Sequence, residues 1–458
     1  MNGADRVDRR HRPAPGPMPR ISLPVFERFR LENGLRVLSV RHDDLPEVSA
    51  RLVLPYGSVE DPPGRAGTAL LTARALTEGS ETRSAREMAE WLDYLGARFT
   101  VEVDYDATLL GLHFLSHVLD GAFDLLAEVI ASPALDADEV SRLRDERLDQ
   151  IASSLDEPRT IGSLRFYEAA FEGHPYAMRS GGVEETVSAI DHTTIRSFHT
   201  RHYRPAAATL VLVGDLPESG ELRGRVEDAF GRWRGERVEP VELKDPADPT
   251  SRRLWGIEWA GPQSEIRVGG IGIARRDPEY AAVQLMNAIL GGLFSSRINM
   301  NLREDKGWTY GAASRLDSRK RRGPFYVGTA VDARASVDAV REILNEMERM
   351  KEEPATSDEL QLAKNAITLS LPRLFETVSQ VSGRIAHQVV YDLPDDYWER
   401  YGDTVRQVGP QDVQRAAGRL LQTDRATIVI VGPLADFLDE LTELGPFERR
   451  DIRGDLVS

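Results

Sequence analysis

One apolar strand sequence occurs twice in this chain, and the repeat limits the folds that the chain can adopt. Residues 206–216 read AAATLVLVGDL with an apolar run that ends at Gly214, and residues 424–434 read DRATIVIVGPL with a run that ends at Gly432. Short continuous apolar runs bounded by turn residues predict strands that are buried on both faces. Each run follows a helical segment near the end of one half of the chain. The repeat therefore predicts an internal duplication of one domain.

The order of elements is the same in both halves: strands, a helix, a strand pair, helices and a closing strand. Strands mixed with helix groups, without strict alternation, predict an α+β fold of two homologous α/β-roll domains, each with a mainly antiparallel sheet packed by helices. Residues 237–253 are rich in proline and charge and have no apolar period, which is typical of a linker. We expect domains at 25–236 and 254–447, each of a size suited to one core, with a disordered Arg/Pro-rich leader at 1–24 and a tail at 448–458.

Short motifs predict where some turns and helices begin. Asn33-Gly34 predicts a β-hairpin turn. Ser84 and Glu87 form a capping box at the start of a helix, and Ser116 is expected to cap the helix VLDGAFDLL. The run SRKRRG at 318–323 is expected to be an exposed turn.

Charge and composition exclude several classes of function. The formal charge is −16, which disfavours nucleic acid and anionic membranes as partners because both are polyanions. The chain has no cysteine, so it has no disulfide, thiolate metal site or thiol nucleophile. It has neither a secretory signal nor an apolar run long enough to cross a bilayer, and a cytoplasmic protein is the expectation.

The segment GGLFSSRINMNLREDKGWTY at 291–310 contains the strongest candidates for chemistry, Arg303 and Tyr310. We expect a short helix from about Ser295 to Arg303 that ends before Gly307, followed by a strand that begins near Tyr310. A loop between the two could direct both side chains at one cleft. Arginine binds a peptide carbonyl or carboxylate, and tyrosine can donate a hydrogen bond to a developing oxyanion.

The run SSRINMNLREDKGWTY resembles the C-terminal-domain motif of the pitrilysin/insulinase family of zinc metallopeptidases, in which a Leu-Arg pair leads through a short glycine-containing loop to a tyrosine. Further stretches resemble segments of the same family in the same order, from about Phe26 to Phe447. They are ENGLRVLSVRHDDLPEVSARLVLPYGS at 32–58, GHPYAMRSGG at 173–182 and RHYRPAAATLVLVGDL at 201–216. The resemblance implies two α+β domains that form half of a clamshell.

The chain departs from the family at the zinc site. Catalytic members carry an inverted motif, His-x-x-Glu-His, on a helix that lies here in GTALLTARALTEGS at 67–80, and a later helix supplies a third ligand, a glutamate. The resemblance places Leu70 and Arg74 at the two histidines, Ala73 at the glutamate and Gln150 near the third ligand. None of the first three can bind zinc or act as the base, and arginine repels a divalent cation. We expect no metal on this chain.

Family members of this kind are similar to the partner subunits of two-chain peptidases. The resemblance implies a heterodimer in which a homologous chain holds the zinc, and this chain supplies Arg303 and Tyr310 in trans to bind and hydrolyse peptides. The chain alone is then expected to be inactive. The alternative is a non-enzymatic protein of the same fold, either an assembly protein similar to the core subunits of respiratory complexes or a peptide-binding homodimer.

Several other motifs are weaker candidates for a functional site. His113 and His117 are four residues apart, but the first lies in an expected strand, so a metal site there is disfavoured. His199 and His202 are expected to flank a loop and pack at the surface, and His174 to form hydrogen bonds in a loop. The glycines at 269–272 lack the full dinucleotide-binding fingerprint and favour a strand.

Overall fold

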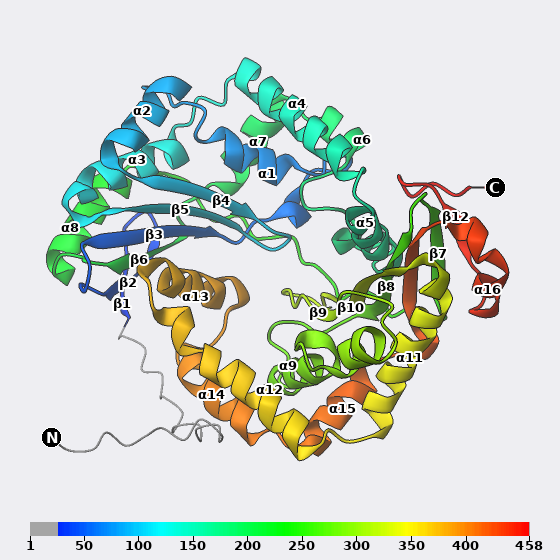
Figure 1. The fold of residues 1–458 in the computed structure, drawn as a ribbon. Coiled ribbons are helices and arrows are strands. Elements are labelled where there is room, and N and C mark those ends of the chain that lie inside the picture. Colours follow the sequence, from blue (N-terminus) through cyan, green and yellow to red (C-terminus); the bar gives the residue numbers. More distant parts are fainter. Residues whose placement is uncertain (1–25, 458) are drawn as a thin grey trace, which may run out of the picture.

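The computed structural model describes residues 26–457, which form two six-stranded sheets with helices packed around them in an arc (Figure 1). The predicted leader lies outside the described residues. The strands of the first sheet, in spatial order, are β1 (Glu27–Arg30), β2 (Arg36–Arg41), β6 (Thr209–Gly214), β3 (Glu47–Leu54), β5 (Thr108–Leu115) and β4 (Arg98–Val103). Those of the second are β12 (Glu448–Arg450), β7 (Arg253–Glu258), β11 (Thr427–Gly432), β8 (Gln263–Ile271), β10 (Pro324–Asp332) and β9 (Ala312–Leu316).

The two repeated strands occupy equivalent places in the two sheets. Every residue of β6 and β11 is buried. β6 runs parallel to β2 and antiparallel to β3, and β11 runs parallel to β7 and antiparallel to β8. The predicted α+β fold with mainly antiparallel sheets is therefore confirmed. The sheets differ at one edge, where β1 precedes β2 in a hairpin but β12 arrives from the end of the chain and pairs parallel with β7.

Each half also contains helices, which lie between its strands and after them along the chain. In the first half they are α1 (Thr68–Ala75), α2 (Ala85–Leu95), α3 (Leu119–Ala131), α4 (Ala137–Ser154), α5 (Pro158–Ala170), α6 (Glu184–Ser188), α7 (His192–His202) and α8 (Ser219–Phe230). In the second half they are α9 (Tyr280–Asn287), α10 (Arg297–Asn299), α11 (Ser336–Glu352), α12 (Ser357–Ser370), α13 (Val378–Tyr391), α14 (Tyr397–Gln407), α15 (Pro410–Leu420) and α16 (Leu438–Glu443).

The local signals have mixed outcomes. The hairpin at Asn33-Gly34 is present, with Gly34 at φ +92°. The capping box of Ser84 and Glu87 starts α2 as predicted. The prediction that Ser116 caps α3 is wrong: Ser116 begins a 3-10 turn, and its hydroxyl donates to Asp215 at 2.7 Å. None of the helices within residues 26–457 has the length and apolar character needed to cross a membrane.

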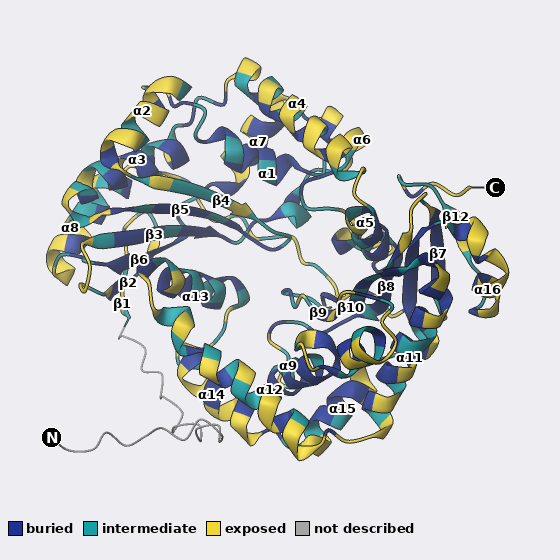
Figure 2. Ribbon diagram, viewed as in Figure 1, coloured by how far each residue is buried: buried dark blue, intermediate teal, exposed yellow. Residues whose placement is uncertain are grey.

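Each sheet is covered on its second face by a helix from the other half of the chain. α5 packs on β11 and β8, where Ile161 and Phe166 join a buried cluster with Val429 and Val431. α13 packs on β3 and β6, where Val381 forms part of a second such cluster. Each half thus contributes one helix to the sheet of the other half, an arrangement that we call the helix exchange. Because of it, both faces of the central strands β6 and β11 are buried (Figure 2). The sequence did not predict it.

The basic run 318–323 is not an exposed turn, and that prediction is wrong. It connects β9 to β10 and reaches the first half of the chain. Arg319 is 4% exposed, with its guanidinium carbon 3.7 Å from the ring centre of Tyr105 and 4.7 Å from that of Tyr176. Asp106 accepts a hydrogen bond from the backbone nitrogen of Lys320 at 2.8 Å and another from the Tyr176 hydroxyl at 2.7 Å. The charged run is thus a contact between the two halves, in which Arg319 is buried and residues 320–322 are half-buried.

Candidate functional site

The segment that carries Arg303 is a wide helical turn. α10 continues directly into a π-helix, η5 (Met300–Asp305), which is followed after Lys306 by Gly307 with φ +65°. Its last turn is closed by the backbone nitrogen of Gly307, which donates to the carbonyl of Arg303 at 3.2 Å. The predicted helix near 295–303 is thus present with a different geometry. π-turns are rare and often occur at functional sites.

The backbone around Tyr310 is held from both sides. The buried hydroxyl of Thr309 donates to the carbonyl of Ala330 at 2.6 Å and accepts a hydrogen bond from the nitrogen of Gly311 at 3.0 Å. Asn299 donates to the carbonyl of Phe294 at 2.6 Å and accepts from the nitrogen of Ala312 at 3.2 Å. These bonds tie the Tyr310 loop to β10 and to the start of the Arg303 helix, so the loop is fixed without a contact from the tyrosine itself.

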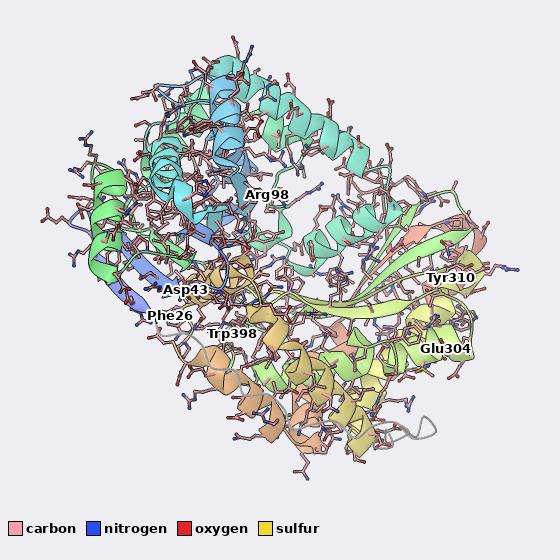
Figure 3. All side chains as sticks on the ribbon, turned by 60° about the vertical axis from the view of Figure 1, so that its left-hand side comes forward. Phe26, Asp43, Arg98, Glu304, Tyr310 and Trp398 are labelled. Atoms are coloured by element: carbon pink, nitrogen blue, oxygen red, sulfur yellow. The ribbon has the colours of Figure 1, made fainter. Side chains whose placement is uncertain are left out.

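The side chains of Arg303 and Tyr310 differ in their surroundings. Tyr310 is 93% exposed. The guanidinium carbon of Arg303 lies 4.4 Å from the ring centre of Phe294, and its Nη1 lies 2.9 Å from the Glu304 carboxylate. Figure 3 labels Tyr310 and Glu304, both on the second half of the chain. Within the described residues, no hydrogen bond or ring contact joins Arg303 to Tyr310.

Phe294 was not among the sequence candidates, although it belongs to this surface. It lies in the turn before α10 and is 70% exposed, and Met300, the first residue of η5, is also exposed. Its only sequence signal is a large aromatic residue beside the glycine pair Gly291-Gly292, outside any apolar period. Phe294, Met300, Arg303 and Tyr310 together present aromatic, apolar and cationic groups that could contact an extended peptide. We call these four residues the Arg–Tyr surface.

The positions that correspond to the zinc motif lie together in the first half. Leu70, Ala73 and Arg74 are on α1, and Gln150 is on α4. Nη1 of Arg74 donates to the amide oxygen of Gln150 at 3.5 Å. Leu70 lies beside the same place, because a Cβ at Gly181 would come within 3.1 Å of its Cδ2. Arg74, Gln150 and Leu70 therefore lie close together in the structure.

Arg147, which the sequence did not single out, fills this place. It is 6% exposed, its Nε donates to the carbonyl of Gly181 at 2.8 Å, and its Nη1 donates to the amide oxygen of Gln150 at 3.3 Å. Burial, together with the charges of Arg179 and Arg74, lowers the pKa of Arg147 to about 10. A site with two guanidinium groups and an aliphatic side chain offers a zinc ion no anionic or imidazole donor and repels it, so these residues do not fit zinc.

Elsewhere in residues 26–457, no group of three or more histidine, aspartate or glutamate side chains is arranged to hold a metal ion. His113 contacts the Glu47 carboxylate at 2.8 Å. His174 accepts a hydrogen bond from the nitrogen of Tyr176 at 3.1 Å and contacts the carbonyl of Lys244 at 3.0 Å, as its predicted loop role requires. Gly269 and Gly270 lie in strand β8 and Gly272 directly follows it, which confirms the predicted strand.

The predicted surface loop position of His199 and His202 is wrong. Both lie on α7, where His202 is 3% exposed and packs against Tyr56 and Phe198 with ring centres 4.7 Å and 4.4 Å away. Burial lowers the pKa of each to about 4. A strongly shifted pKa can mark a catalytic residue, but apolar packing accounts for the shift of His202 without one.

We predict that His202→Phe reduces the amount by which the free energy of unfolding falls between neutral and acidic pH. The folded pKa of about 4 lies below the ordinary value near 6.5, so the unfolded chain binds the extra proton first, and stability falls as the pH drops from about 6.5 to about 4. Phenylalanine keeps the ring packing and removes this loss, which is up to about 3 kcal/mol. Urea unfolding at pH 7 and pH 4.5 measures it. His192→Phe, on the exposed first turn of α7, is the control and should retain the wild-type acid dependence.

Comparison with known proteins gives a consistent picture. The family model described as "Insulinase (Peptidase family M16)" matches residues 36–180, and that described as "Peptidase M16 inactive domain" matches residues 189–367. A Mycobacterium bovis protein named as a zinc protease is 27% identical over 410 residues, which cover 89% of this chain and 93% of the relative. A zinc protease from Streptomyces coelicolor is 24% identical over 428 residues, 90% of each chain.

Two solved structures have the same fold. The crystal structure of a peptidase M16 inactive domain from Pseudomonas fluorescens matches with a TM-score of 0.83 and 28% identity, over 89% of this chain and 98% of that one. The crystal structure of a protease from Helicobacter pylori matches with a TM-score of 0.84 and 21% identity, over 90% of this chain and all of the other.

Proposed function

This chain belongs to the insulinase (M16) family of peptidases but lacks the family's zinc motif, and we propose that it is the zinc-less subunit of a two-chain metallopeptidase. A homologous partner holds the zinc and hydrolyses peptides. This chain supplies Arg303 and Tyr310 to the partner's site. It binds no metal of its own and has no peptidase activity alone.

The observation that carries the proposal is the contrast between the two candidate sites. The positions of the zinc motif hold Leu70, Ala73 and Arg74, and a buried arginine lies beside them. The Arg–Tyr surface, by contrast, keeps an exposed tyrosine on a loop fixed by hydrogen bonds from the side chains of Thr309 and Asn299 to the backbone. An exposed tyrosine on a fixed loop has little use in packing, whereas it suits contact with a ligand from outside the chain.

Each residue of the pair has a distinct role in this proposal. Tyr310 donates its phenolic hydrogen bond to the oxygen of the scissile carbonyl as negative charge develops there. Arg303, whose guanidinium packs against Phe294, holds a neighbouring carbonyl of the peptide and fixes its register. Both act by orientation and charge stabilisation and transfer no group themselves.

The test is co-purification. A tagged copy of this chain, expressed in its own organism at native level, should retain a chain of similar size in near-equal amount, and that chain should contain His-x-x-Glu-His. Recovery of this chain alone, or with only an assembly of unrelated proteins, would contradict the proposal and favour a peptide-binding or assembly role.

A further inference from the structure

Two arginines converge on one neutral oxygen at the place that corresponds to the zinc site. Nη1 of Arg74, from α1, lies 3.5 Å from the amide oxygen of Gln150, and Nη1 of Arg147, from α4, lies 3.3 Å from the same atom. A guanidinium group has five N–H donors in a fixed fork. One shared amide oxygen and the carbonyl of Gly181 leave several of these ten donors for another acceptor.

In the part of the chain that the structure describes, no acidic side chain pairs with either arginine. Within residues 26–457, no carboxylate oxygen lies within 4.0 Å of a side-chain nitrogen of Arg74 or Arg147. Other arginines of α4 differ: Arg142 pairs with glutamates from α4 and with Glu78, and Arg144 pairs with Asp145. Arg147 is the more deeply buried, yet its hydrogen-bond acceptors are neutral.

This arrangement is unfavourable until an anion arrives. A buried cation without a counter-ion keeps its full desolvation cost, and the neighbouring arginine adds repulsion. Arg147 nevertheless remains protonated at neutral pH, because burial lowers its pKa only to about 10. A carboxylate placed beside Gln150 would offer two oxygens to the two forks and form charge-assisted hydrogen bonds, which are stronger than those to a neutral amide.

We propose that Arg74 and Arg147 form a binding site for a carboxylate of a peptide, at the end of its chain or on an acidic side chain. The place that would bind the metal in a zinc-carrying relative thus holds an anion in this chain. That the carboxylate belongs to a peptide rests on the proposed function; the preference for an anion rests on the two arginines. Leu70, beside the pair, gives the ligand an apolar contact.

The test uses the full chain alone and three forms of one fluorescent peptide with neutral side chains. The first ends in a free carboxylate, the second in an amide, and the third in an amide with one internal glutamate. Fluorescence anisotropy should show at least one carboxylate form binding at least about tenfold more tightly than the neutral form. Which form binds tightly identifies the source of the carboxylate. Equal affinity for all three would overturn the proposal.

The decisive variant is Arg74→Gln. Arg74 is half-buried, and the one hydrogen bond that its side chain forms among residues 26–457 is long, so its loss should not prevent folding. We expect this variant to lose the preference for a carboxylate, while Arg144→Gln, on the same helix as Arg147, keeps it. A preference that persists without Arg74 would contradict the site.

Gln150→Glu is an independent second variant. It places a carboxylate within the chain between the two guanidinium groups. We expect it to raise the thermal midpoint of unfolding and to weaken the carboxylate preference, since the internal group competes with the ligand. An unchanged preference and an unchanged midpoint would count against the proposal.

These measurements need neither partner nor hydrolysis. If the chain prefers a carboxylate but has no zinc-carrying partner, the arginine site is supported and the proposed function is contradicted. If the two-chain complex is active but this chain binds all three peptides equally, the proposed function is supported and the arginine site is contradicted.

Discussion

Tyr310→Phe lowers kcat of the two-chain peptidase by about a hundredfold and leaves KM nearly unchanged. The phenol is assigned to an oxygen that becomes negative only as the reaction proceeds, so its removal affects the transition state far more than the bound peptide. The substitution removes one hydroxyl from a side chain that is 93% exposed, and folding should not change. Steady-state hydrolysis of a quenched fluorescent peptide by the reconstituted complex measures the effect.

The control for this prediction is Tyr94→Phe. Tyr94 is 76% exposed on α2, where it stacks on Trp91 with ring centres 5.1 Å apart, and nothing assigns it a role in hydrolysis. It should leave both kinetic constants unchanged. If Tyr310→Phe is equally silent in an active complex, Tyr310 has no role in the reaction, and the contribution of the second half must come from other residues.

Arg319→Met lowers the free energy of unfolding by about 3 kcal/mol. Arg319 lies between the rings of Tyr105 and Tyr176, and a desolvated cation over an aromatic face contributes about 2 kcal/mol or more. Methionine fills part of the space but carries no charge. Because Tyr105 and Tyr176 belong to the first half and Arg319 to the second, the loss also weakens the contact between the halves.

Urea unfolding followed by far-ultraviolet circular dichroism measures this loss. Arg315→Met is the matched control, because Arg315 is exposed on β9 of the same hairpin, and its replacement should change the unfolding free energy by less than about 0.5 kcal/mol. Equal midpoints for the two variants would mean that the buried guanidinium of Arg319 adds no net stability at this contact.

The fold was predictable where the sequence pattern is strong. The apolar runs that became β6 and β11 have no charged residue, and their repetition indicated two copies of one domain. The basic run 318–323 was misjudged because its partners, Asp106 and Tyr176, are distant in sequence.

The candidate site was predictable only in part. Arg303 and Tyr310 came from resemblance, and no spacing rule would have placed them on a π-turn and a fixed loop. Arg147 lies in RDERLDQ, where most residues are charged or polar, but its spacing from Val140, Leu143 and Ile151 places it on the buried face of α4, and this spacing was the signal for it. Its burial depends on contact with Gly181, which only tertiary structure supplies.

Zinc content and peptide hydrolysis, measured on this chain alone and on an equimolar mixture with its His-x-x-Glu-His partner, test the central claim most directly. The account predicts no stoichiometric zinc and no turnover for the chain alone. It predicts turnover in the mixture, with one zinc per pair of chains. One zinc per molecule of the isolated chain, together with unaided peptide hydrolysis, would contradict it.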